Sequence, residues 1–326
     1  MKSEKFDDKI LELFKKHDES YLSGEDVSRA LGISRQALWK HIEKLRETGY
    51  IIEAVPHLGY KLMQVPDKIL VPEIRWNLKT KIIGREIHFY ENAGSTNDIA
   101  YGLATADARE GTIVIANEQA KGKGRLGRKW ASPEGGVYFS CILRPDILLN
   151  EIPKITLVAA TSAVKAIRKF SGLHALIKWP NDIFISDKKA GGILTELKGE
   201  PDRAVFVVLG IGINVNTPKH MLPEKGTSIK EESKSGRDFS RVDFIKEVLI
   251  ALEKEYMKFK GGGFSSIRGD LKSFSCTLGR HVNIMTGKRK KIEGKAVDID
   301  KDGALVVALA SGKRERILSG DVRIER

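Results

Sequence analysis

The stretch GKGRLGRKW, residues 122–130, places three glycines and four cations within nine residues. Its glycines follow the spacing G-x-G-x-x-G of a dinucleotide-binding turn. That turn requires a helix directly after the third glycine, because the free N–H groups of the helix face the pyrophosphate. Pro133, Gly135 and Gly136 follow instead, and they prevent a stable helix. The stretch therefore excludes a doubly wound fold built on this turn.

Two other phosphate-binding loops are also excluded. A P-loop needs Lys followed by Ser or Thr after its last glycine, but Arg128 and Lys129 stand there. A kinase glycine loop would be followed by H-R-D and D-F-G motifs, which the chain lacks. We therefore expect a loop between two strands, whose backbone can approach a ligand closely and whose cations can neutralise phosphate and carboxylate.

The residues around this loop alternate between strand-like and helix-like runs. Strands are predicted at 86–90, 112–116, 137–143, 176–178, 183–186, 192–197 and 204–213. Helices are predicted at 97–106, 155–170 and 242–259, the first of them capped by Ser95 with Asp98. Because many strands lie close together with few helices between them, the pattern favours an α+β domain with a mixed, mostly antiparallel sheet flanked by helices.

Residues 1–64 follow the pattern of a winged helix-turn-helix. Helices are predicted at 4–17, from a Ser23–Asp26 capping box to Leu31, and from Ser34 to Gly49, with a turn at Gly32. A hairpin of strands at 50–55 and 60–63 follows.

The last of these helices carries the candidate DNA contacts. They are Ser34, Arg35, Gln36, Trp39, Lys40 and Lys44. Arg and Gln side chains can read base edges, and Lys can contact phosphate. The alternative is a helical protein-interaction module with a solvated charged face.

The net charge of +13 is unevenly distributed along the 326 residues. Residues 1–65 carry 11 basic and 11 acidic side chains, whereas 66–270 carry 32 against 25 and 271–326 carry 13 against 7. Basicity alone does not distinguish DNA, a nucleotide or an acidic protein as the partner.

The chain has neither an apolar run that could span a membrane nor a signal-peptide pattern. Its two cysteines, Cys141 and Cys276, are not in a metal-ligand spacing. We therefore expect a cytoplasmic protein with free thiols.

Residues 271–326 predict a small antiparallel barrel, with strand-like runs at 280–285, 291–299, 304–309, 313–318 and 321–324. The basic run GKRKK, residues 287–291, is expected at a solvated hairpin tip, with a phosphate site or a contact with an acidic protein as alternatives. The predicted domains are 1–64, a proline-containing linker at 65–72, 73–270 and 271–326.

Short polar clusters stand at the predicted strand ends of the middle domain. In chain order they are Gly-Ser-Thr-Asn (94–97), Gln-x-x-Gly-x-Gly-Arg-x-Gly-Arg-x-Trp (119–130), Lys-Trp-Pro-Asn-Asp (178–182) and Gly-Ile-Gly-Ile-Asn-Val (210–215). Each alone is ordinary turn chemistry. In this order and spacing, the sequence resembles the biotin–protein ligases. With its N-terminal module it is similar to the bifunctional type that also represses the biotin operon.

The resemblance implies a class II synthetase-like central domain and an SH3-like C-terminal domain. It also implies that biotin and ATP, with Mg²⁺ bound to the substrate and no metal site of the protein itself, give biotinyl-5′-AMP. Biotin then passes to a lysine of the biotin carboxyl carrier domain of a carboxylase. A homodimer is expected to bind operator DNA with the adenylate as corepressor, and no membrane is involved.

The resemblance also assigns roles to residues. The biotin-binding set is Ser95, Thr96, Asn97, Gln119, Lys123, Gly124, Arg125 and Lys189. The adenylate-binding set is Arg128, Trp130, Asn181 and Asn214, and the catalytic set is Arg125, Lys189, Lys178 and Asp182. Lys123 stands where the family usually has Arg, which removes a planar fork, and Leu126 stands where the bacterial pattern often has Arg.

Two other functions fit parts of the sequence. A lipoate or other acyl ligase would share the middle domain, but lipoate lacks the ureido group that the Ser-Thr-Asn cluster and Gln119 suit. A ligand-sensing repressor without ligase activity would not need the charged loop, Lys178 and Lys189. The chain shows no Ser-His-Asp or Cys-His nucleophile, and an adenylate, being an activated acyl donor, requires none.

Overall fold

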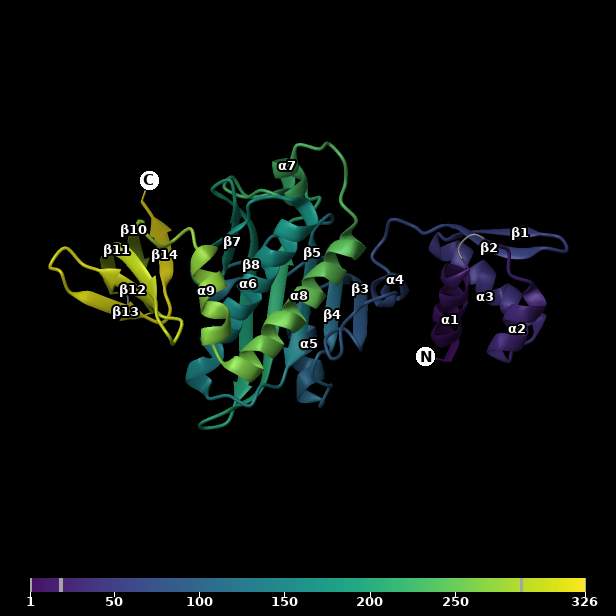
Figure 1. The fold of residues 1–326 in the computed structure, drawn as a ribbon, viewed down its shortest axis with the longest axis horizontal. Helices are drawn as coiled ribbons and strands as arrows, with labels where there is room; N and C mark the ends of the chain where they lie inside the picture. Colours follow the sequence, from purple (N-terminus) through teal and green to yellow (C-terminus); the bar gives the residue numbers. More distant parts are fainter. Residues whose placement is uncertain (1, 18–19, 288–289, 326) are drawn as a thin grey trace. The chain divides into compact units, whose positions relative to one another are not determined.

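The computed structural model describes residues 2–17, 20–287 and 290–325. The chain forms two compact units, Met1–Asn77 and Leu78–Arg326. Figure 1 labels their helices and strands. We describe each unit by itself.

The first unit has the helices and the hairpin that the sequence predicts. Its elements are α1 (Lys2–Lys16), α2 (Gly24–Leu31), α3 (Arg35–Thr48), β1 (Ile51–Val55), β2 (Gly59–Gln64) and α4 (Val71–Arg75). Ser23 Oγ accepts a hydrogen bond from Glu25 N, and Ser34 Oγ accepts one from Ala37 N, so both predicted N-caps are confirmed. The capping box is only half formed, because the Asp26 carboxylate pairs with Arg29 instead.

The segment after the hairpin is more structured than a linker. The first unit extends through Asn77, so it includes residues 65–72, which the sequence assigned to a linker. Within the unit, Ile69 and Ile74 are buried. The buried carboxylate of Glu73, on α4, accepts hydrogen bonds from Lys15 Nζ at 2.5 Å and Tyr50 Oη at 2.8 Å. These contacts anchor α4 to the helical core.

The second unit is built on a seven-stranded sheet, in the order β3-β4-β5-β9-β8-β7-β6. The strands are β3 (Ile87–Ala93), β4 (Ile113–Gln119), β5 (Val137–Leu143), β6 (Leu176–Lys178), β7 (Asp182–Ile185), β8 (Lys188–Gly199) and β9 (Ala204–Ile213). Only β3 and β4 pair in parallel, and the other neighbours are antiparallel. The predicted mixed, mostly antiparallel sheet is confirmed.

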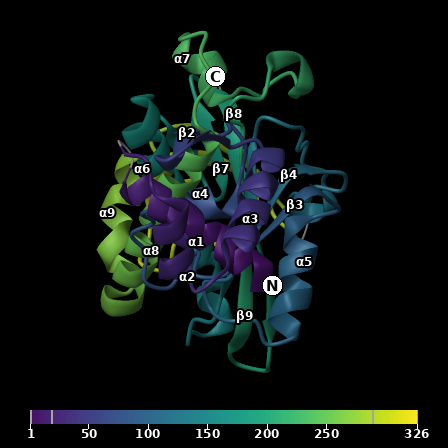
Figure 2. The ribbon, with the colours of Figure 1, turned by 90° about the vertical axis from the view of Figure 1, so that its right-hand side faces the viewer.

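Helices cover both faces of this sheet. The helices of the unit are α5 (Thr96–Thr105), α6 (Ile152–Ser171), α7 (Ile229–Ser233), α8 (Arg241–Gly262) and α9 (Ser265–Ser273), with short 3₁₀ turns at Arg125–Gly127, Leu149–Glu151 and Lys219–Met221. Thr195 of β8 bonds Thr156 of α6, while the next residue, Glu196, accepts a hydrogen bond from Asn97 of α5. Successive strand residues face opposite sides, so α5 and α6 cover opposite faces. Figure 2 shows the strands between α5 on one side and α8 with α9 on the other.

The C-terminal residues form a five-stranded antiparallel sheet, in the order β13-β12-β11-β10-β14. Its strands are β10 (His281–Met285), β11 (Lys291–Ile299), β12 (Leu305–Ala308), β13 (Arg314–Ile317) and β14 (Asp321–Ile324). The five predicted runs are strands, but β13 and β14 are the two edges, so the described sheet does not close into the predicted barrel. The proposed basic hairpin tip includes residues 288–289, which lie outside the described residues.

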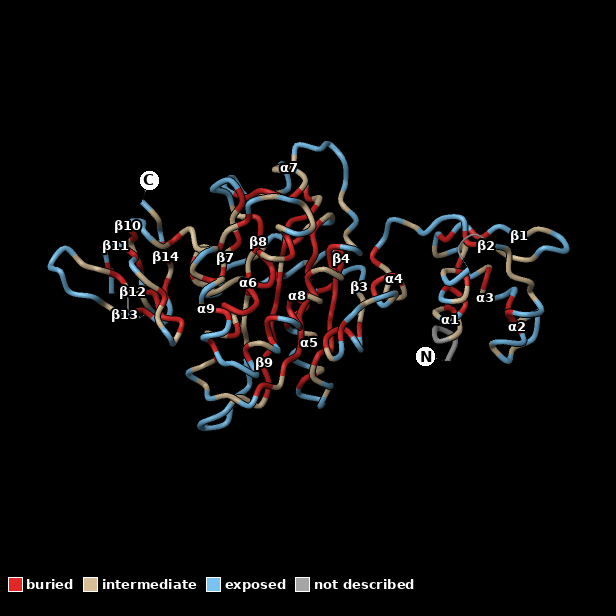
Figure 3. The backbone as a smooth tube through the Cα atoms, viewed as in Figure 1, coloured by how far each residue is buried: buried red, intermediate tan, exposed pale blue. Residues whose placement is uncertain are grey.

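The apolar core of the second unit follows the central strands and α6. Every residue of β5 is buried, as are most residues of β9, and Figure 3 shows this core in red between exposed loops. Cys141 and Cys276 are both free, and burial raises the pKa of each thiol. In the described ranges, no helix combines the length and the apolar character needed to cross a membrane.

Candidate functional site

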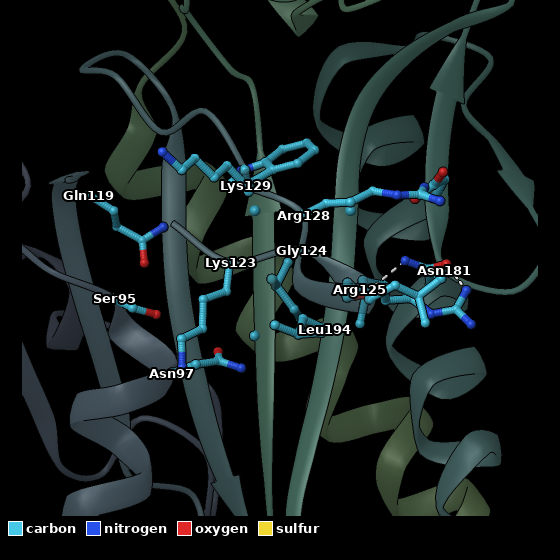
Figure 4. Close-up of a pocket in the computed structure, with 18 of the residues that line it drawn as sticks. Ser95, Asn97, Gln119, Lys123, Gly124, Arg125, Arg128, Lys129, Asn181 and Leu194 are labelled. Carbon is cyan, nitrogen blue, oxygen red and sulfur yellow. Dashed lines mark hydrogen bonds between the residues drawn. The ribbon is translucent and has the colours of Figure 1, made fainter. Parts of the chain in front are cut away.

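A cavity opens on the α5 face of the central sheet, next to the glycine-rich loop between β4 and β5. It is lined by most of the residues that the sequence analysis singled out: Ser95, Thr96, Asn97, Gln119, Lys123, Gly124, Arg125, Arg128, Trp130, Asn181, Asp182 and Lys189. They come from the start of α5, the end of β4, the loop, the β6–β7 turn with the start of β7, and β8. Figure 4 shows Lys123 pointing toward Asn97 and Arg125 lying beside Asn181.

Glycines make the floor of the cavity. Gly192 pairs with Gly212, and Leu194 with Gly210, on strands β8 and β9. A Cβ at Gly210 would lie 2.2 Å from Asn97 Oδ1, and one at Gly212 would lie 2.6 Å from Trp130 Nε1. The absence of side chains on these strands therefore lets Asn97 and Trp130 lie directly against the sheet.

The N-terminus of α5 is capped from a distant strand. Gln119 Oε1, at the end of β4, accepts hydrogen bonds from Thr96 N at 2.8 Å and Thr96 Oγ1 at 3.2 Å. Its amide nitrogen donates to Ser132 Oγ at 2.9 Å. Ser95 occupies the N-cap position but makes no side-chain capping bond. Ser95 is thus the N-cap residue, as predicted, but Gln119 supplies the capping acceptor in place of the Ser95 hydroxyl.

A second set of hydrogen bonds fixes Asn97. Its Nδ2 donates to Glu196 Oε2 at 2.7 Å, which orients Oδ1 toward Ser140 Oγ at 2.6 Å. Ser140 Oγ also lies 2.8 Å from Thr96 Oγ1. Because Asn97 Oδ1 can only accept, the single Ser140 proton points to it. Thr96, Asn97, Gln119 and Ser140 therefore form a fixed group of neutral donors and acceptors at this end of the cavity, with the Glu196 carboxylate holding Asn97.

The glycine-rich loop has a structure of its own. Gly124 N donates to Arg128 O at 2.7 Å, and Trp130 N donates to Gly122 O at 2.9 Å, which narrows the loop to a hairpin. At its tip, Leu126 has a positive φ of 58° and is 72% exposed. The loop joins two strands, as predicted, and no helix follows it.

Lys123 pairs with Asp98 of α5 and lies 3.9 Å from Glu196 Oε1. The hydrogen bond that Lys123 Nζ donates to the Asp98 carboxylate is the main reason that the pKa of Lys123 is raised. The positive charge of Lys123 is therefore matched by carboxylates that do not belong to the loop.

Arg125 lies between neutral partners. Its NH1 donates to Asn181 Oδ1 at 2.8 Å and to Gly320 O at 3.4 Å. Asn181 is fixed in turn by a bond from its Nδ2 to Ile193 O at 3.0 Å. Burial lowers the pKa of Arg125, against the attraction of Asp182 and Asp321. A guanidinium remains charged at neutral pH, so the cavity contains a cation whose hydrogen-bond partners are uncharged.

Lys189 and Trp130 meet at the same end of the cavity. Lys189 Nζ lies 2.7 Å from Asp182 Oδ1 and 5.2 Å from the centre of the Trp130 ring. Trp130 Nε1 is buried without a hydrogen-bond partner. The arrangement places an ammonium, a carboxylate and an aromatic face within reach of one ligand.

Two predicted site residues do not line the cavity. Lys178 Nζ lies 5.4 Å from the centre of the Phe184 ring. Asn214 is buried, and its Nδ2 donates to Thr227 O at 2.9 Å. The structure therefore gives both side chains roles within the fold, beside the cavity.

Several lining residues were not predicted. Gly192 and Leu194 were not singled out, and Gly210 and Gly212 stood in the 210–215 motif without an assigned role. Glu196, Ser132 and Ser140, which bond lining residues but do not line the cavity themselves, carried no pattern. Gly320 and Asp321 come from the C-terminal sheet. No local signal links them to a loop nearly two hundred residues earlier.

The side chains of α3 that are predicted to contact DNA differ in the contacts that they make within the protein. Gln36, Trp39 and Lys40 are exposed. Ser34 caps the helix and Arg35 pairs with Glu25. Lys44 Nζ lies 2.6 Å from Asp7 Oδ2 of α1, which also contacts His41 at 2.6 Å. Lys44 is exposed, as the sequence predicted, but its ammonium is paired with a carboxylate of α1.

The cavity combines neutral hydrogen-bonding groups at one end with Arg125 and Lys189 at the other. Such a site suits a small molecule with a polar head and an anionic tail, with charge compensation where a carboxylate and a phosphate would meet. In the parts of the chain that the structure describes, no three His, Cys, Asp or Glu side chains gather in a way that could hold a metal ion.

Comparison with known families gives three matches along the chain. Residues 91–214 match the biotin/lipoate A/B protein ligase family, residues 8–61 match an HTH domain, and residues 277–324 match the biotin protein ligase C terminal domain.

Whole relatives and a solved structure are also similar. The chain is 40% identical to the bifunctional ligase/repressor BirA of Bacillus subtilis over 97% of both chains, and 30% identical to that of Escherichia coli over 87% of both. The structure of the Aquifex aeolicus biotin protein ligase in complex with biotin and ATP superposes with a TM-score of 0.64 and 31% identity, over 74% of this chain and 99% of that one. The chain therefore belongs to the biotin protein ligases, in the group of the bifunctional ligase/repressors.

Proposed function

We propose that the chain activates biotin with ATP and passes it to a lysine of a biotin carboxyl carrier domain. The observation that carries this proposal is the division of the cavity into a neutral polar end and a cationic end. In the first step the biotin carboxylate attacks the α-phosphorus of ATP, which gives biotinyl-5′-AMP and pyrophosphate. In the second, the carrier lysine amine attacks the acyl carbon and AMP leaves.

The polar end suits the ureido ring of biotin. Ser95, Thr96, Asn97 and Gln119 offer neutral donors and acceptors there, and Gln119 and Asn97 are already oriented by their neighbours. Backbone groups at Gly124 complete this side. Fixed donors and acceptors lower the entropy cost of ordering the site around the ligand.

The cationic end suits the reacting carboxylate and phosphate, which repel each other. We assign Arg125 and Lys189 to this charge compensation, with Arg128 beside them on the loop. Lys123 lies at the other end, against Asp98 of α5, and stays in the proposed biotin-binding set. Trp130 offers a face for adenine, and Asn181 and Asp182 lie beside the phosphates. Mg²⁺ enters with ATP as part of the substrate, with Asp182 as the nearby carboxylate. Lys178 and Asn214 support this wall from behind.

We also propose that the first unit binds operator DNA as a winged helix-turn-helix. The exposed Gln36, Trp39 and Lys40 on α3 and the β1–β2 hairpin support this role. A homodimer that forms with the adenylate bound would place two such units on a palindromic operator. In this scheme residues 1–64 bind DNA, 73–270 form a class II synthetase-like ligase domain, 271–326 form an SH3-like domain, and the protein acts in the cytoplasm.

The decisive experiment measures biotin-dependent release of pyrophosphate from ATP, followed by incorporation of biotin or lipoate into a carrier domain. Biotin-dependent release with incorporation of biotin alone is expected. Incorporation of lipoate would point to the acyl-ligase alternative, and no release in the presence of bound biotin would point to a sensor without ligase activity. DNA binding with and without biotin plus ATP then tests the coupling of the two functions.

A further inference from the structure

The cations of the glycine-rich loop differ in what holds them. Lys123 pairs with Asp98 on α5, close to the start of the loop. Arg125 bonds an amide and a backbone carbonyl. Arg128 pairs with Asp321, which belongs to the C-terminal sheet. The second half of the loop is therefore attached to a different part of the fold from the first half.

Two hydrogen bonds join the Arg128 guanidinium to the Asp321 carboxylate. NH1 lies 3.3 Å from Oδ1 and NH2 lies 2.5 Å from Oδ2. The hydrogen bond with Asp321 raises the pKa of Arg128, and the same bond lowers the pKa of Asp321. Most exposed ion pairs contribute little, but a fork of two parallel bonds from Arg to a carboxylate is the favourable exception.

The carboxylate of Asp321 is held in place by its own strand. Asp321 is the first residue of β14 and pairs with Met285 of β10. Before it, Gly320 packs so closely that an added Cβ would lie 2.6 Å from Ile284 Cγ2. This tight turn also presents Gly320 O to Arg125 at 3.4 Å. One turn of the C-terminal sheet thus contacts both arginines of the loop.

We propose that Asp321 is a positioning residue for the ligase reaction, which fixes Arg128 and so keeps the glycine-rich loop closed against the C-terminal sheet. The inference rests on the proposed function, in which the closed loop covers biotinyl-5′-AMP. Asp321 acts through Arg128, because the carboxylate is neutralised by it. Without Arg128, the same carboxylate would stand unpaired at the edge of a site that binds an anion.

The unpaired carboxylate gives the proposal a measurable consequence that a merely structural role of Asp321 would not produce. Asp321→Asn in the wild-type background removes the pair and frees the loop. In an Arg128→Ala background, the same substitution removes an unpaired negative charge near the phosphate. The effect of Asp321→Asn on adenylate retention should therefore change sign or vanish in the second background.

The experiment uses the full chain and measures the release of biotinyl-5′-AMP during a chase with excess biotin. We expect Asp321→Asn to speed release about fivefold, the scale of one favourable exposed ion pair, and Asp321→Glu to restore slow release in part. The matched control is Glu315→Gln, because Glu315 lies on β13 of the same sheet and pairs with Lys290. This control should release the adenylate at the wild-type rate.

A second measurement separates this inference from the proposed function. Limited trypsin digestion of the ligand-free chain should cleave within residues 121–129 about five times faster in Asp321→Asn than in Glu315→Gln or wild type. This holds even if the chain makes no adenylate, in which case only the proposed function fails. Equal cleavage in all three proteins would overturn the proposed role of Asp321. Equal acceleration of adenylate release by Asp321→Asn in the wild-type and Arg128→Ala backgrounds would overturn it too.

Discussion

Gly210 lies directly beneath the side-chain amide of Asn97. A Cβ at position 210 would lie 2.2 Å from Asn97 Oδ1, which is far inside van der Waals contact. Asn97 cannot easily move away, because Glu196 and Ser140 hold its amide at 2.7 Å and 2.6 Å. A methyl group on this strand would therefore push Asn97, the preorganised side chain that we propose binds biotin, out of position.

The first prediction follows from this contact. Gly210→Ala should raise the KM for biotin at least about fivefold, because overpacking of this kind costs about 1–3 kcal/mol. Gly102→Ala, on α5, is the matched control, since nothing lies within 4 Å of its Cβ position. That variant should keep its KM and gain slightly in stability. Steady-state kinetics with biotin varied measures both, and an unchanged KM in Gly210→Ala contradicts the site.

The glycine-rich loop should become resistant to protease when the ligand binds. Its charged, glycine-rich residues bury little apolar area, so the contacts with Asn181, Gly320 and Asp321 offset only part of the backbone entropy cost of about 1–2 kcal/mol per residue, and a ligand adds further contacts. Biotin plus ATP should slow trypsin cleavage after Arg125 and Arg128 at least about tenfold. Cleavage after the exposed Arg237, outside the cavity, is the internal reference. Equal slowing at all three residues would indicate a general effect on the enzyme or protease.

The buried carboxylate of Glu73 should be essential for the stability of the first unit. Glu73→Ala would leave Lys15 and Tyr50 without their buried partner. Loss of one member of a buried ion pair costs about 3–5 kcal/mol. Asp26→Asn, at an exposed pair with Arg29, should cost less than about 1 kcal/mol. Urea unfolding of the full-length variants, followed by hydrogen exchange in residues 6–75, measures both changes in stability. Similar losses of stability in Glu73→Ala and Asp26→Asn would contradict the anchoring of α4.

Asp300 should make the C-terminal sheet sensitive to acid. Burial opposes ionisation, but the hydrogen bond from Arg316 and those from Asp302 N and Ala304 N outweigh it, so the pKa of Asp300 lies below its ordinary value of 3.8. A lowered folded-state pKa means that the stabilisation is present above pH 3.8 and is lost as the pH falls through the folded-state pKa.

Asp300→Asn should therefore lower the melting temperature at pH 7, and the difference from wild type should shrink below about pH 4 as both proteins lose the ionised form. Glu293→Gln removes one member of an exposed ion pair on β11 and provides the comparison. It should change the melting temperature little at either pH. Thermal unfolding across this range is the measurement. A difference that stays constant with pH would show that the charge of Asp300 contributes nothing.

The fold followed from the sequence wherever the signal was local. The strand at 137–143 was bounded correctly, and Pro133 with Gly135 and Gly136 correctly excluded a helix after the loop. Ser34 and Gly49 also marked the two ends of α3 correctly. In each case the residues that determine the structure are neighbours along the chain.

The errors came from contacts between distant residues. Gln119 replaces Ser95 as the acceptor at the start of α5, and Asp7 holds Lys44 close to α1. Asp321 is separated from Arg128 by 193 residues, so no spacing could have paired them. The predicted barrel is not confirmed, because its closure depends on how β13 and β14 meet, which alternation within each strand does not determine.

The different surroundings of the Lys40 and Lys44 ammonium groups give a last prediction, for DNA binding. Lys40 is exposed on α3, whereas the Lys44 ammonium lies 2.6 Å from Asp7 Oδ2. If α3 enters the major groove, Lys40→Ala should weaken operator binding and reduce its salt dependence by about one phosphate contact, because a Lys–phosphate contact releases a counterion. Lys44→Ala should reduce the salt slope less, since its charge is already shared with a carboxylate. Fluorescence anisotropy with operator DNA at several salt concentrations measures both slopes. A larger change in Lys44→Ala would mean that the Asp7 pair opens on DNA and that Lys44 reaches the phosphate.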